Sequence, residues 1–251
     1  GDLSRLLEGR EAEMMFADPP YGVAYEGGRF HSGDVGIKRA RERLAGDDED
    51  IYPVFLPKAL AVVNGPCYVF FAGTRALSLY QAAHDARAEV SGLIVWHKTN
   101  ATYAAMGAQY KQRHEPILYL KRRGATLRWV GPSDERTVWE EARDPRNDMH
   151  PTQKPVALPL RAINNHDAGT VLDPFLGSGT TMIAAEKLGR VCYGMEIEPR
   201  YVDVAVRRWM NATGQVATRE SDGMEFPADE TGEATMAKLG HRVDPLPEAS
   251  T

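Results

Sequence analysis

Leu172-Asp173-Pro174-Phe175-Leu176-Gly177-Ser178-Gly179-Thr180-Thr181 joins an apolar run to a stretch with helical periodicity. The pattern predicts a strand over 170–175, a glycine-rich turn over 176–181 and a helix over 182–188. A strand over 191–197 and a helix over 199–210, with Pro199 at its first position, repeat the arrangement. Alternating strands and helices pack as a parallel sheet with helices on both faces, so the predicted fold class is α/β.

The glycine turn predicts a nucleoside ligand. Glycines let the backbone approach a ligand closely, and a helix amino terminus favours a carboxylate or phosphate. The phosphate loop of ATPases needs a lysine after Gly179, and the dinucleotide motif needs a glycine where Met182 stands. A cofactor with an adenosine and an amino-acid end remains, and Glu196, about 20 residues on, can bind its ribose hydroxyls. The alternative is a glycine pair that serves helix packing, with Glu196 as an exposed strand-end charge.

The rest of the chain alternates in the same way. Expected helices cover 3–7, 57–63, 75–86 and 156–165, and expected strands cover 14–17, 67–72, 93–97 and 116–121. The last two strands predict a long-armed antiparallel hairpin at a sheet edge. Residues 26–50 are Gly-rich and then charged, which predicts a mobile loop. Residues 122–150 are expected to be irregular, and the acidic residues 215–251 to form a tail or linker.

Asp18-Pro19-Pro20-Tyr21 follows the strand expected over 14–17. The Asp18 carboxylate and the carbonyl between the prolines accept hydrogen bonds, and neither proline donates one. The Tyr21 ring offers a face on which a base can stack. These residues are suited to hold an exocyclic amino group and to direct its nitrogen at an electrophile. The alternative is a stiff turn with Asp18 as an ordinary turn residue.

Composition and charge are those of a globular protein. The 251 residues can form one large domain or two small ones, no apolar run is long enough to span a membrane, and no secretory signal is visible. Cys67 and Cys192 are isolated, which fits free thiols in a reducing cytoplasm and offers no metal-ligand spacing. The net charge of −5 argues against a protein that coats nucleic acid, but residues 98–130 hold seven basic residues and one acidic residue, Glu115. This local charge of +6 suits contact with phosphates; the alternative is a solvated hairpin with a chance charge excess.

Together these motifs resemble those of S-adenosylmethionine-dependent DNA amino-methyltransferases, the N6-adenine/N4-cytosine family. Asp-Pro-Pro-Tyr at 18–21 comes first, then His-Pro-Thr-Gln-Lys-Pro at 150–155, Asp-Pro-Phe-Leu-Gly-Ser-Gly-Thr-Thr at 173–181 and Gly-Met-Glu at 194–196. This permuted order resembles the β class, and the resemblance covers residues 1–216. It implies a Rossmann-like methyltransferase fold with a catalytic half over 1–97, an edge hairpin and target-recognition region over 98–149, and a cofactor-binding half over 150–214, ahead of the tail over 215–251.

The resemblance also implies site residues. The catalytic set is Asp18, Pro19, Pro20 and Tyr21, and the set that binds S-adenosylmethionine is Asp2, Thr152, Lys154, Asp173, Phe175, Gly177, Gly179, Thr180 and Glu196. Glu196 takes the ribose, and Thr152 and Lys154 lie in the block that closes over the methionine carboxylate. Asp2 lies in the segment that helps to hold the adenine, and it is equally suited to cap the first helix. No metal site is expected.

The implied partner is double-stranded DNA, with phosphate contacts expected from Lys98, Lys111, Arg113, Arg122 and Arg123. The target base has to be flipped out of the duplex to reach a buried cofactor, and the loop over 26–50 is expected to fold over DNA or that base. In this family an Asp at the first motif position accompanies adenine N6 more often than cytosine N4, so Asp18 favours adenine. Trp96 is expected to pack in the core. The expected setting is the cytoplasm, with a bacterial or phage gene, and many members of the class are homodimers.

Two other functions compete with DNA methylation: methylation of a different substrate, and binding without catalysis. Asn/Asp-Pro-Pro-Tyr also serves methylation of RNA bases and of protein glutamine, but those enzymes usually place the glycine motif first. A cofactor-binding module without catalysis, acting in DNA binding or assembly, is the second rival. The presence of Asp18, Tyr21 and Glu196 argues against it.

Overall fold

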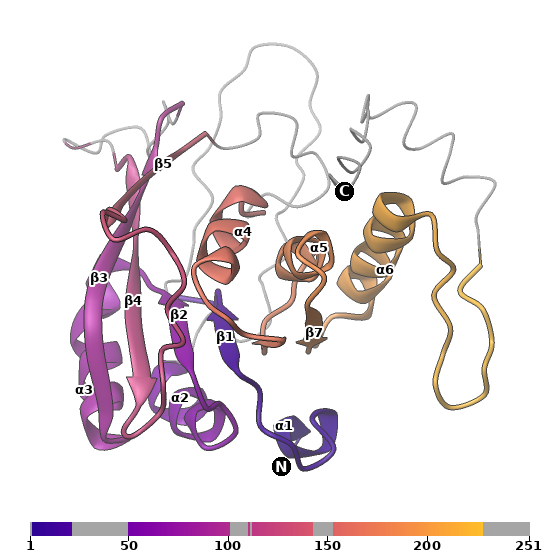
Figure 1. Cartoon of the computed structure of the whole chain (residues 1–251), viewed down its shortest axis with the longest axis horizontal. Helices are drawn as coiled ribbons and strands as arrows, with labels where there is room; N and C mark the ends of the chain where they lie inside the picture. Colours follow the sequence, from indigo (N-terminus) through magenta and orange to yellow (C-terminus); the bar gives the residue numbers. More distant parts are fainter. Residues whose placement is uncertain (1, 22–49, 101–109, 111, 143–152, 228–251) are drawn as a thin grey trace, which may run out of the picture.

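The computed structural model describes residues 2–21, 50–100, 110, 112–142 and 153–227. A seven-stranded sheet in the order β5-β3-β4-β2-β1-β6-β7 forms its centre (Figure 1). The strands are β1 (Met14–Ala17), β2 (Pro66–Phe70), β3 (Ala88–Lys98), β4 (His114–Arg122), β5 (Val138–Glu141), β6 (Thr170–Asp173) and β7 (Val191–Gly194). The predicted α/β class, with a mostly parallel sheet and an antiparallel hairpin, is confirmed.

Within this sheet, β4 runs against the other strands. It pairs antiparallel with β2 and β3, whereas the pairs β1–β2, β1–β6, β6–β7 and β3–β5 are parallel. The carboxyl ends of six strands therefore lie at one edge of the sheet, together with the amino end of β4. We call this the carboxyl edge. Open α/β sheets bind their ligands outside this edge, so the predicted motifs should meet here.

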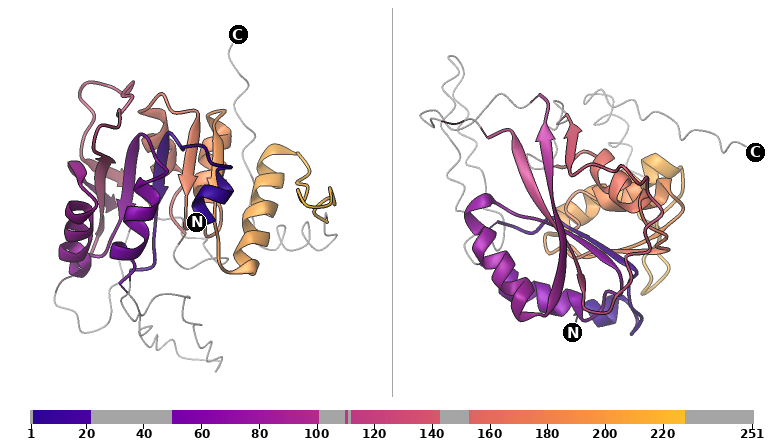
Figure 2. Two further views of the ribbon diagram at one scale, coloured as in Figure 1. Left: turned by 90° about the horizontal axis from the view of Figure 1, so that it is seen from below. Right: turned by 60° about the vertical axis from the view of Figure 1, so that its left-hand side comes forward.

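Helices cover both faces of the sheet (Figure 2). α1 (Asp2–Leu6), α2 (Tyr52–Leu60) and α3 (Ala76–Asp85), which follows a short 3₁₀ turn (Gly73–Arg75), pack on one face. α4 (Ala157–Asn164) and α5 (Thr180–Lys187) pack on the other face, where α6 (Pro199–Thr213) packs against α5. Side chains of β2 alternate between the two cores, with Cys67 and Val69 on the α2 side and Tyr68 and Phe70 on the α4 side. Burial on both faces explains why the strands read as continuous apolar runs.

The predicted hairpin lies one strand inside the sheet border. β3 and β4 pair from Ala88–Arg122 to His97–His114, and β5 pairs parallel with β3 on the outside. β5 falls within 122–150, where we expected irregular structure, because four residues are too few for periodicity to reveal. Trp139 anchors this strand with 1% exposure. Trp96 is buried as expected, and its Nε1 donates to the Glu141 carbonyl at 2.9 Å.

α2 begins at Tyr52, five residues before the predicted start. Pro53 lies in its first turn, where a missing N–H costs no helical bond, whereas Pro57 lies inside the helix. An interior proline costs about 3 kcal/mol, and full burial of a large apolar side chain contributes about 1.5–3 kcal/mol. The apolar face therefore outweighs the proline, since it buries Tyr52, Phe55, Leu56, Ala59 and Leu60.

The segment after residue 215, the loop over 26–50 and the two thiols were also predicted from the sequence. The predicted tail begins with residues that hold one antiparallel bridge, Thr218–Glu225, and 228–251 lie outside the described residues. The predicted loop over 26–50 also lies outside them, except for Asp50. Cys67 and Cys192 are both free, the first buried and the second half-buried. Among the helices that the structure describes, none combines the length and the apolar character needed to cross a membrane.

Candidate active site at the carboxyl edge

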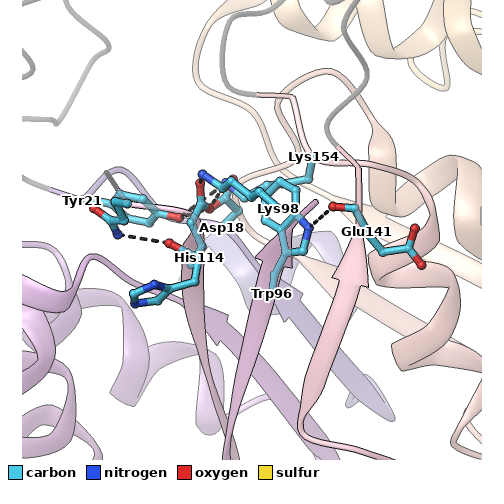
Figure 3. A network of polar contacts seen from close by, with 9 residues as sticks. Asp18, Tyr21, Trp96, Lys98, His114, Glu141 and Lys154 are labelled. Carbon is cyan, nitrogen blue, oxygen red and sulfur yellow. Dashed lines mark hydrogen bonds and ion pairs between the residues drawn. The ribbon is translucent and has the colours of Figure 1, made fainter. Parts of the chain in front are cut away.

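The Asp18 turn leaves β1 at the carboxyl edge and is held from several sides. The Asp18 carboxylate accepts a hydrogen bond from the Tyr21 hydroxyl at Oδ1 (2.9 Å) and pairs with the Lys154 ammonium at Oδ2 (2.6 Å) (Figure 3). Arg75, just beyond β2, donates from Nε to the Tyr21 carbonyl at 3.2 Å. Pro19 is buried between these contacts. The Asp18 side chain nevertheless remains 27% exposed.

Glu115 is a second carboxylate of this cluster, and the sequence did not identify it. It lies near the amino end of β4, where Oε2 is 3.1 Å from both the Lys154 ammonium and the Tyr21 hydroxyl. Its Oε1 pairs with the Lys98 ammonium. One signal in the sequence did mark it, because Glu115 is the single acidic residue in the basic stretch 98–130. Opposite charges therefore alternate along a chain of contacts from Lys98 through Glu115 and Lys154 to Asp18, and the last three of these contact the Tyr21 hydroxyl.

Burial and charge shift the pKa values of this cluster. Burial raises the pKa of Asp18, although the Lys154 ammonium opposes the shift. Burial also acts to raise the pKa of Glu115, but the ammonium groups of Lys154 and Lys98 outweigh it and bring this pKa to about 2. Burial acts to lower the pKa of Lys154, but the negative charges of Asp18 and Glu115 outweigh burial and raise this pKa. Glu115 is thus ionised at any physiological pH, and Asp18 holds a proton more readily than an ordinary aspartate.

The turn after β6 begins with a carboxylate in a different environment. Asp173 is 4% exposed, and its Oδ1 accepts a hydrogen bond from the Phe175 N–H at 3.0 Å. Burial raises its pKa to about 7 against the hydrogen bonds from Thr181 and Phe175, and the Asp18 charge adds to the rise. This aspartate therefore stabilises the backbone of its own turn.

The two glycines of this turn serve different purposes. Gly179 has a φ of +82°, and a Cβ added to it would lie 2.9 Å from the Cβ of Ala205 in α6. Gly177 has a φ of +52°, and a Cβ added there would meet no atom closer than 3.9 Å. Gly179 is required for packing, which is the alternative that the sequence left open. Gly177 leaves open space beside the turn, as a bound ligand would require.

Glu196 follows β7 at the same edge and contacts the glycine turn directly. Its Oε2 accepts a hydrogen bond from the Gly177 N–H (2.8 Å), and its Oε1 accepts one from the Glu198 N–H (2.9 Å). A carboxylate has about four lone-pair sites, so both oxygens can still accept hydroxyl groups. The predicted association of the glycine turn with an acid on the next strand is therefore present.

The catalytic turn and the glycine turn start side by side. Met15 of β1 pairs with Leu172 of β6, so Asp18 and Asp173 leave neighbouring strands, which lie about 5 Å apart in a sheet. The Thr180 hydroxyl, at the start of α5, donates to the Lys154 carbonyl at 3.4 Å and links the glycine turn to the block at 150–155. The structure thus brings two separate sequence motifs into one site.

Two residues predicted to bind the cofactor are placed differently, and a third is not among the described residues. The Lys154 ammonium lies with Asp18 and Glu115, and it is the Lys154 carbonyl that contacts the glycine turn. Asp2 lies inside α1 rather than capping it, and its exposed carboxylate pairs with Arg5 at 3.3 Å. Thr152 lies outside the described residues. The cofactor contacts expected from these three residues stay predictions.

The cations predicted to contact DNA do not form one surface. Lys98 is 12% exposed and paired with Glu115, whereas Arg113 is exposed at the carboxyl edge and donates to the Thr99 carbonyl at 2.8 Å. Arg122 ends β4 at the opposite edge, seven residues from Glu115, or about 23 Å at roughly 3.3 Å per residue. There it pairs with Glu11 at 2.8 Å, and the exposed Arg123 follows it. The length of β4 therefore divides the basic stretch 98–130 between the two edges of the sheet, and Lys111 lies outside the described residues. The DNA contacts expected from these cations stay predictions.

The sequence of this chain is similar to that of known proteins. A family model described as DNA methylase matches residues 12–207. The Type II methyltransferase M2.DpnII of Streptococcus pneumoniae is 28% identical over 221 residues, which are 78% of this chain and 81% of that protein. The Type II methyltransferase M2.MboI of Moraxella bovis is 24% identical over 233 residues, which are 84% of this chain and 85% of that protein.

Solved structures share the fold. The crystal structure of the M1.HpyAVI–SAM complex matches with a TM-score of 0.61 at 24% identity, over 80% of this chain and 91% of that chain. The cytosine-N4-specific PvuII DNA methyltransferase matches with a TM-score of 0.62 at 16% identity, over 96% of this chain and 89% of that chain. The residues matched by the family model include all seven strands, the Asp18 turn and the glycine turn.

Proposed function

The chain belongs to the DNA methylase family, the S-adenosylmethionine-dependent amino-methyltransferases of the N6-adenine/N4-cytosine type, and from this premise we propose that it methylates adenine N6 at specific sites in double-stranded DNA. One observation carries the proposal: an accessible Asp18 carboxylate lies beside the glycine turn, at the edge where α/β sheets bind ligands. The Asp at this position favours adenine over cytosine N4. We assign a restriction–modification context in a bacterial or phage-infected cytoplasm, as the names of the Type II relatives suggest.

S-adenosylmethionine fits the residues around the glycine turn. The open space beside Gly177 lets the cofactor approach the backbone, and the Glu196 carboxylate keeps lone pairs for the ribose hydroxyls. Phe175 and Thr180 lie in or next to the turn, and Asp173 holds the backbone of the turn through the Phe175 N–H. When bound, the cofactor supplies an electrophilic methyl group on a sulfonium centre.

The chain's own contribution to the reaction is to position the amine. The Asp18 carboxylate and the Pro19 carbonyl accept the two N–H groups, which makes the nitrogen lone pair more available and fixes its direction. Positioning of this kind can supply several kcal/mol of the barrier. As the nitrogen formed its bond to the methyl carbon, the carbon–sulfur bond would break and leave a neutral thioether. The nitrogen would become positively charged, and Asp18 would accept one N–H proton. The raised pKa of Asp18 suits it to this transfer.

The target base leaves the DNA duplex and stacks on Tyr21, because an amine inside the duplex cannot reach the carboxyl edge of the sheet. The hydrogen bonds from Tyr21 to Asp18 and Glu115 hold its hydroxyl, and hence its ring, in a defined orientation. Arg113, exposed where β4 begins at the same edge, is a described candidate for a phosphate contact.

Methylation of amplified, unmethylated DNA with methyl-labelled S-adenosylmethionine tests the proposal. We expect label in N6-methyldeoxyadenosine after digestion to nucleosides. Label in N4-methyldeoxycytidine instead would mean that the target base is cytosine. Label in RNA or protein alone would favour the rival interpretation in which those molecules are the substrates. Cofactor binding with no transfer to any substrate would favour the other rival, a non-catalytic module.

A further inference from the structure

Both carboxylate oxygens of Asp18 already have donors. Oδ1 accepts from the Tyr21 hydroxyl at 2.9 Å, and Oδ2 faces the Lys154 ammonium at 2.6 Å. Each oxygen keeps a further lone pair, but the Lys154 ammonium carries a full positive charge and attracts the carboxylate more strongly than a neutral amine does. A target amine therefore binds Asp18 more strongly once another acceptor takes over these donors.

Glu115 faces the same two donors. Its Oε2 lies 3.1 Å from the Lys154 ammonium and 3.1 Å from the Tyr21 hydroxyl, while its Oε1 is occupied by Lys98. The Glu115 side chain is only 17% exposed, so water competes little for the free oxygen. Small movements of two side chains would transfer both donors from Asp18 to Glu115.

The charges of the cluster make such a transfer feasible. Lys98 and Lys154 balance Asp18 and Glu115, and Lys98 pairs with the Glu115 oxygen that Lys154 does not contact. The pKa of Glu115 is about 2, so this acceptor keeps its charge throughout the physiological range. A neutral residue in its place would leave the Lys154 ammonium with Asp18 as its one anionic partner in the cluster.

From this geometry we propose that Glu115 is a positioning residue of methyl transfer: it draws Lys154 and the Tyr21 hydroxyl away from Asp18 so that Asp18 can accept the target amine. The inference rests on the proposed function. Glu115 acts through Lys154 and Tyr21 and need not touch the base.

The β3–β4 hairpin supplies a matched control. A second Lys–Glu pair, Lys121 with Glu89 (2.6 Å), joins the same two strands at their opposite ends. In the described part of the chain, Glu89 contacts Lys121 and none of the residues clustered around Asp18. Glu89→Gln therefore removes a cross-strand ion pair from the hairpin without altering the site.

The test measures single-turnover label transfer to unmethylated DNA by the full chain, with enzyme in excess over labelled cofactor. We expect Glu115→Gln to lower the rate about 10- to 100-fold, with cofactor affinity within twofold of wild type, and Glu89→Gln to leave the rate within twofold. The decisive comparison repeats Glu115→Gln in a Lys154→Met background. The substitution should cost less than threefold there, because the ammonium that Glu115 draws away is absent.

Each outcome decides the inference. A Glu115→Gln variant as fast as wild type, or an equal loss in both backgrounds, would overturn it. If Glu115→Gln does not fold, Glu115→Asp, which keeps the charge on a shorter side chain, is measured in the same two backgrounds, and again an equal loss in both overturns the inference. A wild-type chain that transfers no label to DNA would overturn the proposed function and this inference with it, whereas an active wild type confines the failure to Glu115.

Discussion

β1 and β6 are neighbouring parallel strands that both end in Asp-Pro, yet their aspartates have different environments. Asp18 is 27% exposed and surrounded by charged side chains, with Lys154 at 2.6 Å. Asp173 is 4% exposed and accepts hydrogen bonds from its own turn, with no cation paired to it among the described residues. The same dipeptide thus forms a ligand-facing acceptor on one strand and a structural brace on the next. Neighbouring side chains, rather than the dipeptide, decide which role an aspartate takes.

The largest expected effect comes from removing the ligand-facing aspartate. Asp18→Ala should lower single-turnover methylation at least about 1,000-fold, or about 4 kcal/mol in activation free energy, because the amine loses its acceptor. Cofactor affinity, measured by calorimetry, should stay within about twofold of the wild-type value. Full activity in this variant would mean that Asp18 does not face the ligand, so that Asp18 and Asp173 would no longer differ in this respect.

Gly179 tests how far the glycine turn depends on packing. Gly179→Ala combines a positive φ with a Cβ placed 2.9 Å from the Ala205 Cβ, so we expect a loss of about 3 kcal/mol in the free energy of unfolding. Gly189→Ala is the control, since Gly189 has a φ of +64° and no atom within 4 Å of an added Cβ. It should cost about 1 kcal/mol. Urea unfolding of both variants measures the difference, and equal losses would show that Ala205 imposes no constraint.

The buried aspartate should also make stability depend on pH. Burial raises the pKa of Asp173 from 3.8 to about 7, so between these values the folded chain holds a proton that the unfolded chain has lost. The contribution of Asp173 to stability therefore falls as the pH rises through this window. Asp173→Asn cannot ionise, and it should gain about 2 kcal/mol relative to wild type between pH 5 and pH 7. Urea unfolding of both chains at several pH values checks this, and a constant difference would mean that Asp173 is not buried as described.

The smallest expected effect concerns the acid that supports the glycine turn. Glu196→Gln keeps a side chain of the same size but loses the charge and one acceptor oxygen, so cofactor affinity should fall about tenfold, or about 1.4 kcal/mol. Glu198→Gln is the matched control, because the Glu198 carboxylate contacts Arg200 (3.1 Å) and no residue of the turn. Calorimetric titration should find the control within about twofold of wild type. An equal loss in both variants would mean that the lost negative charge, and not a contact with the ribose, lowers the cofactor affinity.

Much of this site was predictable because it is encoded locally. β1 has the limits that its apolar run predicts, α6 begins at Pro199 as expected, and the glycine turn lies between the expected strand and helix. Each of these features depends on a few consecutive residues. The meeting of the two motifs at one edge then follows from the shared direction of parallel strands.

The features that the sequence did not reveal depend on tertiary arrangement. Glu115 joins the site because β4 runs opposite to its neighbours, which brings a strand's amino end to the carboxyl edge. Arg122 and Arg123 leave the site for the same reason, since they follow that strand to its far end. The early start of α2 depended on burial outweighing Pro57, which local propensity could not show.

The pairing of β1 with β6 spans two residue pairs, Met14–Val171 and Met15–Leu172, all of them fully buried. This short seam joins the part of the chain that we propose holds the amine to the part that we propose holds the methyl donor. A displacement of about 1 Å between reacting groups can lower a rate about 100-fold. The distance that the methyl group travels is therefore set inside the core, by methionine, valine and leucine side chains that touch no ligand. A repacking of these four residues would change the speed of the enzyme while leaving every residue of its active site in place.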